Sequence, residues 1–105
     1  AVRVPVLIGH AESIYIETKD DLDINKVKKC LGDFPGISVI DDIESVDFPT
    51  SFEHGHGTDN VYIGRIRRGL DKNNSLNLWV VADNVRKGAA LNSVQIAEHL
   101  IGGKA

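Results

Sequence analysis

The sequence predicts an α+β fold in which a mixed β-sheet packs with two helices, in the chain order β-β-α-β, long loop, β-β-α. Three observations predict it. Short runs of β-branched residues recur along the chain, and only two segments have helical periodicity. The 105 residues, 42% hydrophobic and 26% charged, are typical of one globular domain. Neither G-x-G-x-x-G nor G-x-x-x-x-G-K-[ST] occurs, so no dinucleotide fold or P-loop is predicted within this sequence.

Two β-rich runs, residues 2–8 and 13–18, open the chain. Pro5 lacks an amide donor, so the first run is expected to be an edge strand or irregular at that point. In the second run the side chains alternate, with Ile14 on one face and Tyr15 on the other. This alternation is typical of a strand with one face toward a core.

A helix is predicted next. Asp23 is a candidate N-cap, and Ile24, Val27 and Leu31 recur on one helical face. Gly32 stands where the first residue beyond the helix is expected.

A short strand at residues 37–41 is expected to follow a turn, and then a long acidic loop at residues 42–60. Unstructured loops of this length are uncommon inside small domains. We therefore expect the loop to be functional or part of an interface.

Residues 61–68 and 76–83 are predicted as the last two strands. The second has apolar residues on both faces, Trp79 and Val81 among them, which predicts an interior strand. The last predicted element is a helix at residues 85–101. Asp83 or Asn84 is its candidate cap, and the helix has a wide apolar sector.

Composition excludes several classes of function. A net charge of −3 argues against a general nucleic-acid binder, and no run of 18 apolar residues predicts a membrane span. One cysteine cannot form an internal disulfide. No basic and then apolar leader is visible. Because the chain starts at Ala1 with a strand-like run and contains no methionine, we expect it to be a piece of a longer polypeptide.

Arg3 and His10 are the main candidates for chemistry. An arginine offers a planar fork of donors for a carboxylate or phosphate, and a histidine beside Gly9 is open to proton exchange with a ligand. A surface ion pair and a strand end are the alternative interpretation. On one straight strand the two residues would face opposite sides, so a shared site requires a bulge or turn at Pro5 or Gly9.

Other motifs have simpler interpretations. The Glu53-His54-Gly55-His56 sequence resembles a metal-ligand cluster, but it lacks a well-spaced further ligand, which favours a solvated loop and no metal. Cys30 borders the apolar stripe of its helix and is interpreted as a small core or boundary residue, not a nucleophile.

Two further segments are candidates for binding an anion or a polar group. One contains clustered positive charge, and the other begins a helix. Three arginines form a positive patch suited to an interface or an anion: Arg65, Arg67 and Arg68. Residues 83–90 open a helix, where ordinary capping with tight packing and binding of an anionic or polar ligand group both remain open.

Three stretches resemble bacterial aspartate-semialdehyde dehydrogenases: V-R-V-P-V-x-x-G-H-A-E, G-R-I-R-R and L-N-L-W-V-V-A-D-N-V-R-K-G-A-A-L-N-S-V-Q-I-A-E. The similarity runs over nearly the whole chain, with these stretches in order and the first helix and the long loop between them. The resemblance implies that residues 1–105 are one C-terminal fragment of a catalytic and dimerisation domain like that of glyceraldehyde-3-phosphate dehydrogenase, with the C-terminal helix at 85–101.

The same resemblance implies a cytoplasmic homodimer or homotetramer that uses NADP, phosphate, aspartyl phosphate and aspartate semialdehyde in the synthesis of lysine, methionine and threonine. His10 matches the general acid/base, Arg3 the residue that binds the substrate carboxylate, and Asn84 a contact to the nicotinamide end of the cofactor. The family's cofactor loop, nucleophilic cysteine and phosphate-binding residues are expected before Ala1, and Cys30 does not match that cysteine. The chain alone is therefore expected to be inactive. The alternative is a self-contained α+β module that binds a metabolite or dimerises without catalysis.

Overall fold

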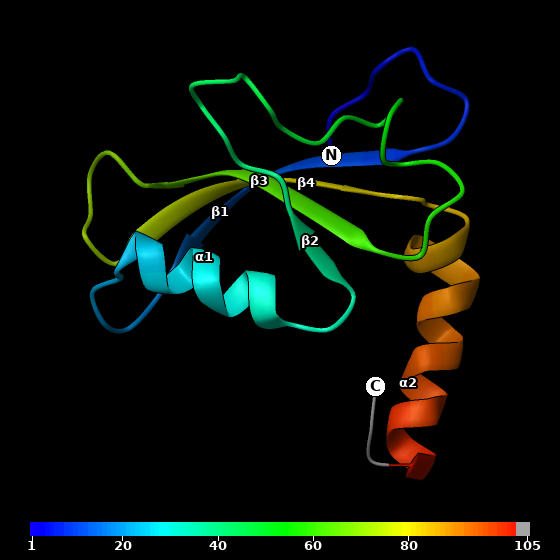
Figure 1. The fold of residues 1–105 in the computed structure, drawn as a ribbon. Helices are drawn as coiled ribbons and strands as arrows, with labels where there is room; N and C mark the ends of the chain where they lie inside the picture. The colour runs from blue at the N-terminus through cyan, green and yellow to red at the C-terminus, as the bar shows by residue number, and fades with distance from the viewer. Residues whose placement is uncertain (103–105) are drawn as a thin grey trace.

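The computed structural model describes residues 1–102 and shows an α+β arrangement with one mixed four-stranded sheet (Figure 1). The strands lie in the order β1-β4-β3-β2, with β4 antiparallel to both of its neighbours and β2 parallel to β3. Their bounds are β1 His10–Glu17, β2 Ile37–Val39, β3 Val61–Arg68 and β4 Ser75–Ala82. The predicted fold class is confirmed, and β4 is the interior strand that its two apolar faces predict.

Helix α1, Ile24–Asp33, covers one face of the sheet. Its apolar residues Ile24, Val27 and Leu31 pack against a buried cluster of Ile63, Ile66, Leu76 and Leu78. Asp23 caps the helix as predicted, since its carboxylate accepts hydrogen bonds from the N–H groups of Asn25 and Lys26. Gly32 does not end the helix, which continues to Asp33 before an extended Phe34.

The loop at residues 42–60 crosses the opposite face of the sheet, as Figure 1 shows in green. It contains no strand, as predicted, and only one isolated bridge, between Asp42 and Asp47. Trp79 Nε1 donates a 2.8 Å hydrogen bond to the carbonyl of the fully buried Pro49. Gly64 allows this approach, because a Cβ there would lie 2.5 Å from Pro49 Cδ. The loop thus serves as the second covering layer of the sheet.

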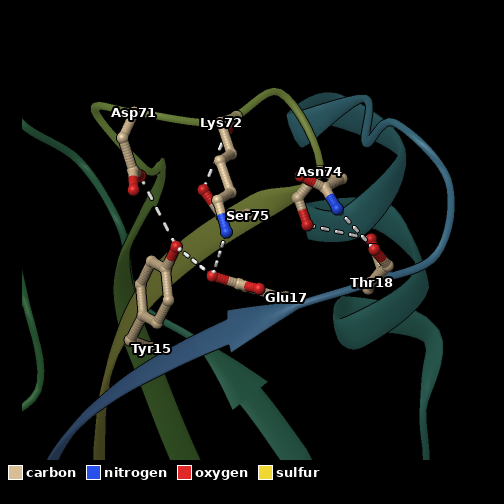
Figure 2. A network of polar contacts seen from close by, with 7 residues as sticks. All are labelled: Tyr15, Glu17, Thr18, Asp71, Lys72, Asn74 and Ser75. Carbon is tan, nitrogen blue, oxygen red and sulfur yellow. Dashed lines mark hydrogen bonds and ion pairs between the residues drawn. The ribbon is translucent and has the colours of Figure 1, made fainter.

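A polar network fixes the pairing of β1 with β4 at the Glu17 end, far from His10 (Figure 2). The hydroxyl of Tyr15 and the ammonium of Lys72 each donate a 2.9 Å hydrogen bond to Glu17 Oε1. The Lys72 ammonium lowers the pKa of the Glu17 carboxyl, and Tyr15 adds to this. Next to this pair, Asn74 Nδ2 donates to the carbonyl of Thr18.

Residues 2–8 do not form a strand, and the irregularity expected at Pro5 is what the structure has. These residues bend, and only Val2 forms a bridge, to Ala11. Pro5 has no N–H to donate, and Gly9 adopts φ 124°, a conformation that reverses the chain. The strand predicted at 13–18 starts three residues earlier instead, at His10.

The strand predicted at 37–41 ends at Val39, because Asp41 directs its carboxylate to the N–H groups of Arg65 and Ile66. The strand predicted at 61–68 matches β3. The strand predicted at 76–83 is β4, displaced by one residue.

The predicted helix at 85–101 consists of two parts. Residues Arg86–Ala90 form a π-helix, η1, and Leu91–Gly102 form α2. The N–H groups of Gly88 and Ala90 bond to carbonyls five residues back, those of Asp83 and Val85, which defines the wider turn.

Helix α2 extends away from the sheet (Figure 1). Its predicted apolar sector is exposed, with Val94 at 54% and Leu100 at 78%. A helix long and apolar enough to cross a membrane is absent from residues 1–102.

Candidate functional site

The chain reverses between Arg3 and His10. Val2 N–H donates a 2.7 Å hydrogen bond to the carbonyl of Ala11, in an antiparallel bridge. This bridge joins the residues directly next to Arg3 and His10. The turn that a shared site requires is therefore present, and Gly9 supplies it.

Asn84 lies beside the same reversal. The N–H of Gly9 donates a 2.9 Å hydrogen bond to Asn84 Oδ1. The bond joins the residue before His10 to the residue two positions after β4. The fold thus gathers all three predicted site residues at one end of the β1–β4 pair. The amide Nδ2 remains as the donor that Asn84 can offer to a ligand.

His10 lines a hollow of about 240 Å³ between the sheet and the start of the C-terminal helices. The imidazole is 42% exposed, and its Nε2 lies 3.5 Å from Glu12 Oε1. The other polar lining residues are Glu12, Lys87 and Asn92, and the last two bond to each other at 2.9 Å. A partly exposed imidazole beside a hollow can exchange a proton with a bound molecule.

Asp83 is the buried acid of this region, with 3% exposure. Burial opposes its ionisation, but hydrogen bonds from the N–H groups of Gly57, Val85 and Arg86 outweigh burial and lower its pKa, with His56 adding to the effect. The prediction of a cap at this turn is confirmed for Asp83, because its Oδ1 accepts from Val85 at 2.8 Å and Arg86 at 3.1 Å. Sequence reasoning missed its third contact, to Gly57, which lies 26 positions earlier.

His54 is part of the loop's own structure. Its Nδ1 accepts a 3.1 Å hydrogen bond from the N–H of Thr50, and its ring packs on Tyr62 at 5.1 Å between centroids. Within residues 1–102 no group of three or more His, Cys, Asp or Glu residues is placed to hold a metal ion. The structure therefore favours the loop interpretation of residues 53–56.

Cys30 is exposed on α1, so its interpretation as a core or boundary residue is wrong. The apolar stripe of α1 turns Ile24, Val27 and Leu31 toward the sheet, and Cys30 lies outside that contact.

The arginine patch divides into two parts. Arg68 donates to the main-chain carbonyls of Asn73 and Leu22 and so has a structural role. Arg65 and Arg67 are exposed and line a separate hollow of about 360 Å³ beside Trp79.

Comparison with known proteins agrees with this fold. Residues 1–87 match the family described as semialdehyde dehydrogenase, dimerisation domain. The chain is 52% identical over 101 residues to aspartate-semialdehyde dehydrogenase of Shewanella sp. (strain DB6705), covering 96% of the chain and 29% of that protein. The Bacillus subtilis (strain 168) aspartate-semialdehyde dehydrogenase is 46% identical over 100 residues, with 94% and 29% covered.

A solved relative has the same architecture. The crystal structure of Vibrio cholerae aspartate semialdehyde dehydrogenase II complexed with ASA superposes with a TM-score of 0.84 at 46% identity, over 94% of this chain and 29% of that one. The fold and its relatives define an α+β domain shared with aspartate-semialdehyde dehydrogenases. The chain belongs to the semialdehyde dehydrogenase, dimerisation domain family. It spans 29% of the length of the relatives named above.

Proposed function

We propose that this domain works within an aspartate-semialdehyde dehydrogenase, which converts L-aspartyl 4-phosphate to L-aspartate 4-semialdehyde with NADPH. Support comes from relatives of that name at 52% and 46% identity. The observation that carries the proposal is the convergence of Arg3, His10 and Asn84, three residues that the resemblance implies, at one chain reversal. Most of the enzyme, including its nucleophile, is then supplied by segments outside this chain.

His10 acts as the general acid/base of this reaction. In the oxidative, phosphorylating direction one ring nitrogen takes the proton of the thiohemiacetal hydroxyl, which forms when the enzyme's thiol adds to the aldehyde, as the hydride leaves. In the biosynthetic direction the imidazole returns that proton. The 42% exposure of the side chain and its place on a hollow support this role, because substrate must reach the ring.

Arg3 binds the α-carboxylate of the substrate. Its guanidinium can donate two parallel hydrogen bonds to a carboxylate, which fixes the orientation as well as the position of the bound molecule. Because the Val2–Ala11 bridge joins the residues next to Arg3 and His10, a substrate held by Arg3 would lie at the same chain reversal as the imidazole.

NADP, when bound, accepts or supplies the hydride. The residues present fit a limited contact with it: Asn84 keeps one amide donor, and Gly88 lines the hollow of His10 without a side chain. Asn84 thus offers a hydrogen bond to the nicotinamide end, and the remaining contacts belong to the rest of the enzyme.

A homodimer or homotetramer is the proposed assembly, in agreement with the dimerisation domain that residues 1–87 match. The self-contained module is less well supported, since Leu7, Leu70 and Ile101 are exposed at 103%, 107% and 89%. Such side chains are expected to be covered by other parts of an enzyme or by a second subunit.

Reduction of NADP by the full-length enzyme, with aspartate semialdehyde, tests the proposed reaction. We expect turnover that requires phosphate. Equal turnover with and without phosphate would contradict the phosphorylating reaction. No turnover even with phosphate would instead support the self-contained module.

A further inference from the structure

The carboxylate of Asp83 joins two segments that are far apart in sequence. Its Oδ1 accepts hydrogen bonds from the first N–H groups of the turn into η1, those of Val85 and Arg86. Its Oδ2 accepts a 2.8 Å hydrogen bond from Gly57 N–H, in the loop that covers the sheet. Its main-chain carbonyl accepts a further bond from Gly88, at 3.0 Å.

Both of these segments also hold Gly9, the residue before His10. Asn84 follows Asp83 directly and accepts the Gly9 N–H at 2.9 Å. From the other side, a Cβ at Gly9 would lie 2.9 Å from the carbonyl of Ser51, and one at Gly55 would lie 3.1 Å from Gly9 Cα. Gly9 is thus enclosed between the β4–η1 turn and the loop at residues 51–57.

The third bond distinguishes Asp83 from an ordinary helix cap. A cap alone requires one side-chain oxygen at the start of the helix. The second oxygen of Asp83 binds a different segment, the loop that contains Gly57. Asp83 is only 3% exposed. Buried main-chain donors rarely lack a partner, so loss of either oxygen would shift the segment that it holds.

We propose that Asp83 is a positioning residue: by binding the β4–η1 turn and the loop at residues 51–57 together, it fixes Gly9 and with it the place of the His10 imidazole. This inference rests on the proposed role of His10 as general acid/base. Asp83 does not touch the substrate and acts only through the segments that enclose Gly9.

The test uses the full-length enzyme with Asp83→Asn and Asp83→Ser. The asparagine keeps the size and one acceptor but presents an amide donor on the other side. The serine retains an oxygen that can cap η1 but is too short to bind Gly57 as well. Asp33→Asn is the matched control, because Asp33 is an exposed aspartate at the end of α1 that pairs with Lys29 of the same helix and touches neither segment.

For both Asp83 variants we expect kcat to fall about 10- to 100-fold, the scale of a small misplacement of a catalytic group, with KM for aspartate semialdehyde changed less than about threefold. Asp33→Asn should keep the wild-type kcat. In a His10→Ala background, Asp83→Asn should have almost no further effect on kcat, because its influence passes through His10.

Two results would overturn the inference. One is a wild-type kcat in both Asp83 variants with only a lower Tm, which would make Asp83 a purely structural residue. The other is a full additional loss of kcat in the double variant. Failure of the proposed function looks different, since His10→Ala would then keep the wild-type kcat by itself.

Discussion

The main-chain N–H of Gly9 donates a 2.9 Å hydrogen bond to Oδ1 of Asn84, 75 positions further along the chain. Together with the bridge from Val2 to Ala11, this bond brings the start of the chain to the end of β4. The candidate site therefore depends on contacts between three segments: the reversal at residues 3–10, the β4–η1 turn and the loop that covers the sheet.

Gly9→Ala is expected to destabilise the domain. The residue has φ 124°, and a Cβ would lie 2.9 Å from the carbonyl of Ser51, so the loop must shift. We expect a loss of about 1–3 kcal/mol in the free energy of unfolding, measured in urea by the fluorescence of Trp79, the single tryptophan of the chain.

The matched control is Gly32→Ala. Gly32 is inside α1, and a Cβ there would meet nothing within 4 Å. A gain of about 0.4–1 kcal/mol is expected, because alanine loses less backbone entropy on folding. Equal effects of the two substitutions would contradict the tight packing around Gly9.

Arg3→Ala in the full-length enzyme should reduce kcat/KM for aspartate semialdehyde about 10- to 100-fold, mainly through KM. Hydrogen bonds to a charged group are worth about 1.5–3 kcal/mol, and each 1.4 kcal/mol is a factor of ten. Arg3→Lys should recover only part of the loss, since it keeps the charge but not the planar fork.

Steady-state kinetics at varied aspartate semialdehyde gives these values. Arg67→Ala is the control, because Arg67 is exposed on β3 and its Nη1 bonds only to its near neighbour, the carbonyl of Arg65. A similar rise in KM for both alanine variants would mean that general positive charge, not Arg3, attracts the substrate.

Asp83 also predicts a pH dependence of stability. Its pKa in the folded domain lies below the ordinary aspartate value of 3.8, because three main-chain N–H groups outweigh the effect of burial. The unfolded chain therefore binds more protons in acid. The stabilisation from Asp83 is complete above the unfolded pKa and is lost as the pH falls through the lower, folded pKa.

Urea unfolding of the wild-type and Asp83→Asn chains between pH 7 and about pH 2 measures this difference. The decline in the free energy of unfolding below about pH 4 should be shallower in the variant. Parallel curves for the two proteins would show that Asp83 does not contribute to the loss of stability in acid.

Local chemistry predicts much of this fold from sequence. Alternation of Ile14 and Tyr15 predicts β1, and the cap at Asp23 with the apolar stripe of the next helix predicts α1, because these signals need only neighbouring residues. The composition of residues 2–8 is typical of a strand but fails to predict their structure. Pro5 and Gly9 prevent regular strand pairing of this segment, and its isolated bridge joins Val2 to Ala11.

The candidate site was predictable in part. The resemblance names Arg3, His10 and Asn84, and their spacing shows that a turn is required between the first two. The contact of Asp83 with Gly57 depends on the folded arrangement of two distant segments, so no local pattern indicates it. The π-helix at Arg86–Ala90 also has no signal in the sequence, since its apolar pattern suits an α-helix equally well.

The exposed apolar surface distinguishes two hypotheses for this chain, the fragment of a larger enzyme and the self-contained module. Val94, Ile96 and Leu100 on α2 are more than half exposed, as are Leu7 and Leu70 elsewhere. We expect the chain alone to bind an apolar dye such as ANS and to self-associate in sedimentation experiments. A monomer that binds no dye and melts cooperatively would instead support the self-contained module.

The central claim is that His10 is the general acid/base of a phosphate-dependent semialdehyde dehydrogenase. The most direct test is NADP reduction by the full-length enzyme with aspartate semialdehyde, with and without phosphate, for the wild type, His10→Ala and the control His99→Ala on exposed α2. We predict that turnover requires phosphate and falls about 10²- to 10⁴-fold in His10→Ala, while His99→Ala keeps the wild-type rate. A wild-type rate in His10→Ala would contradict the claim.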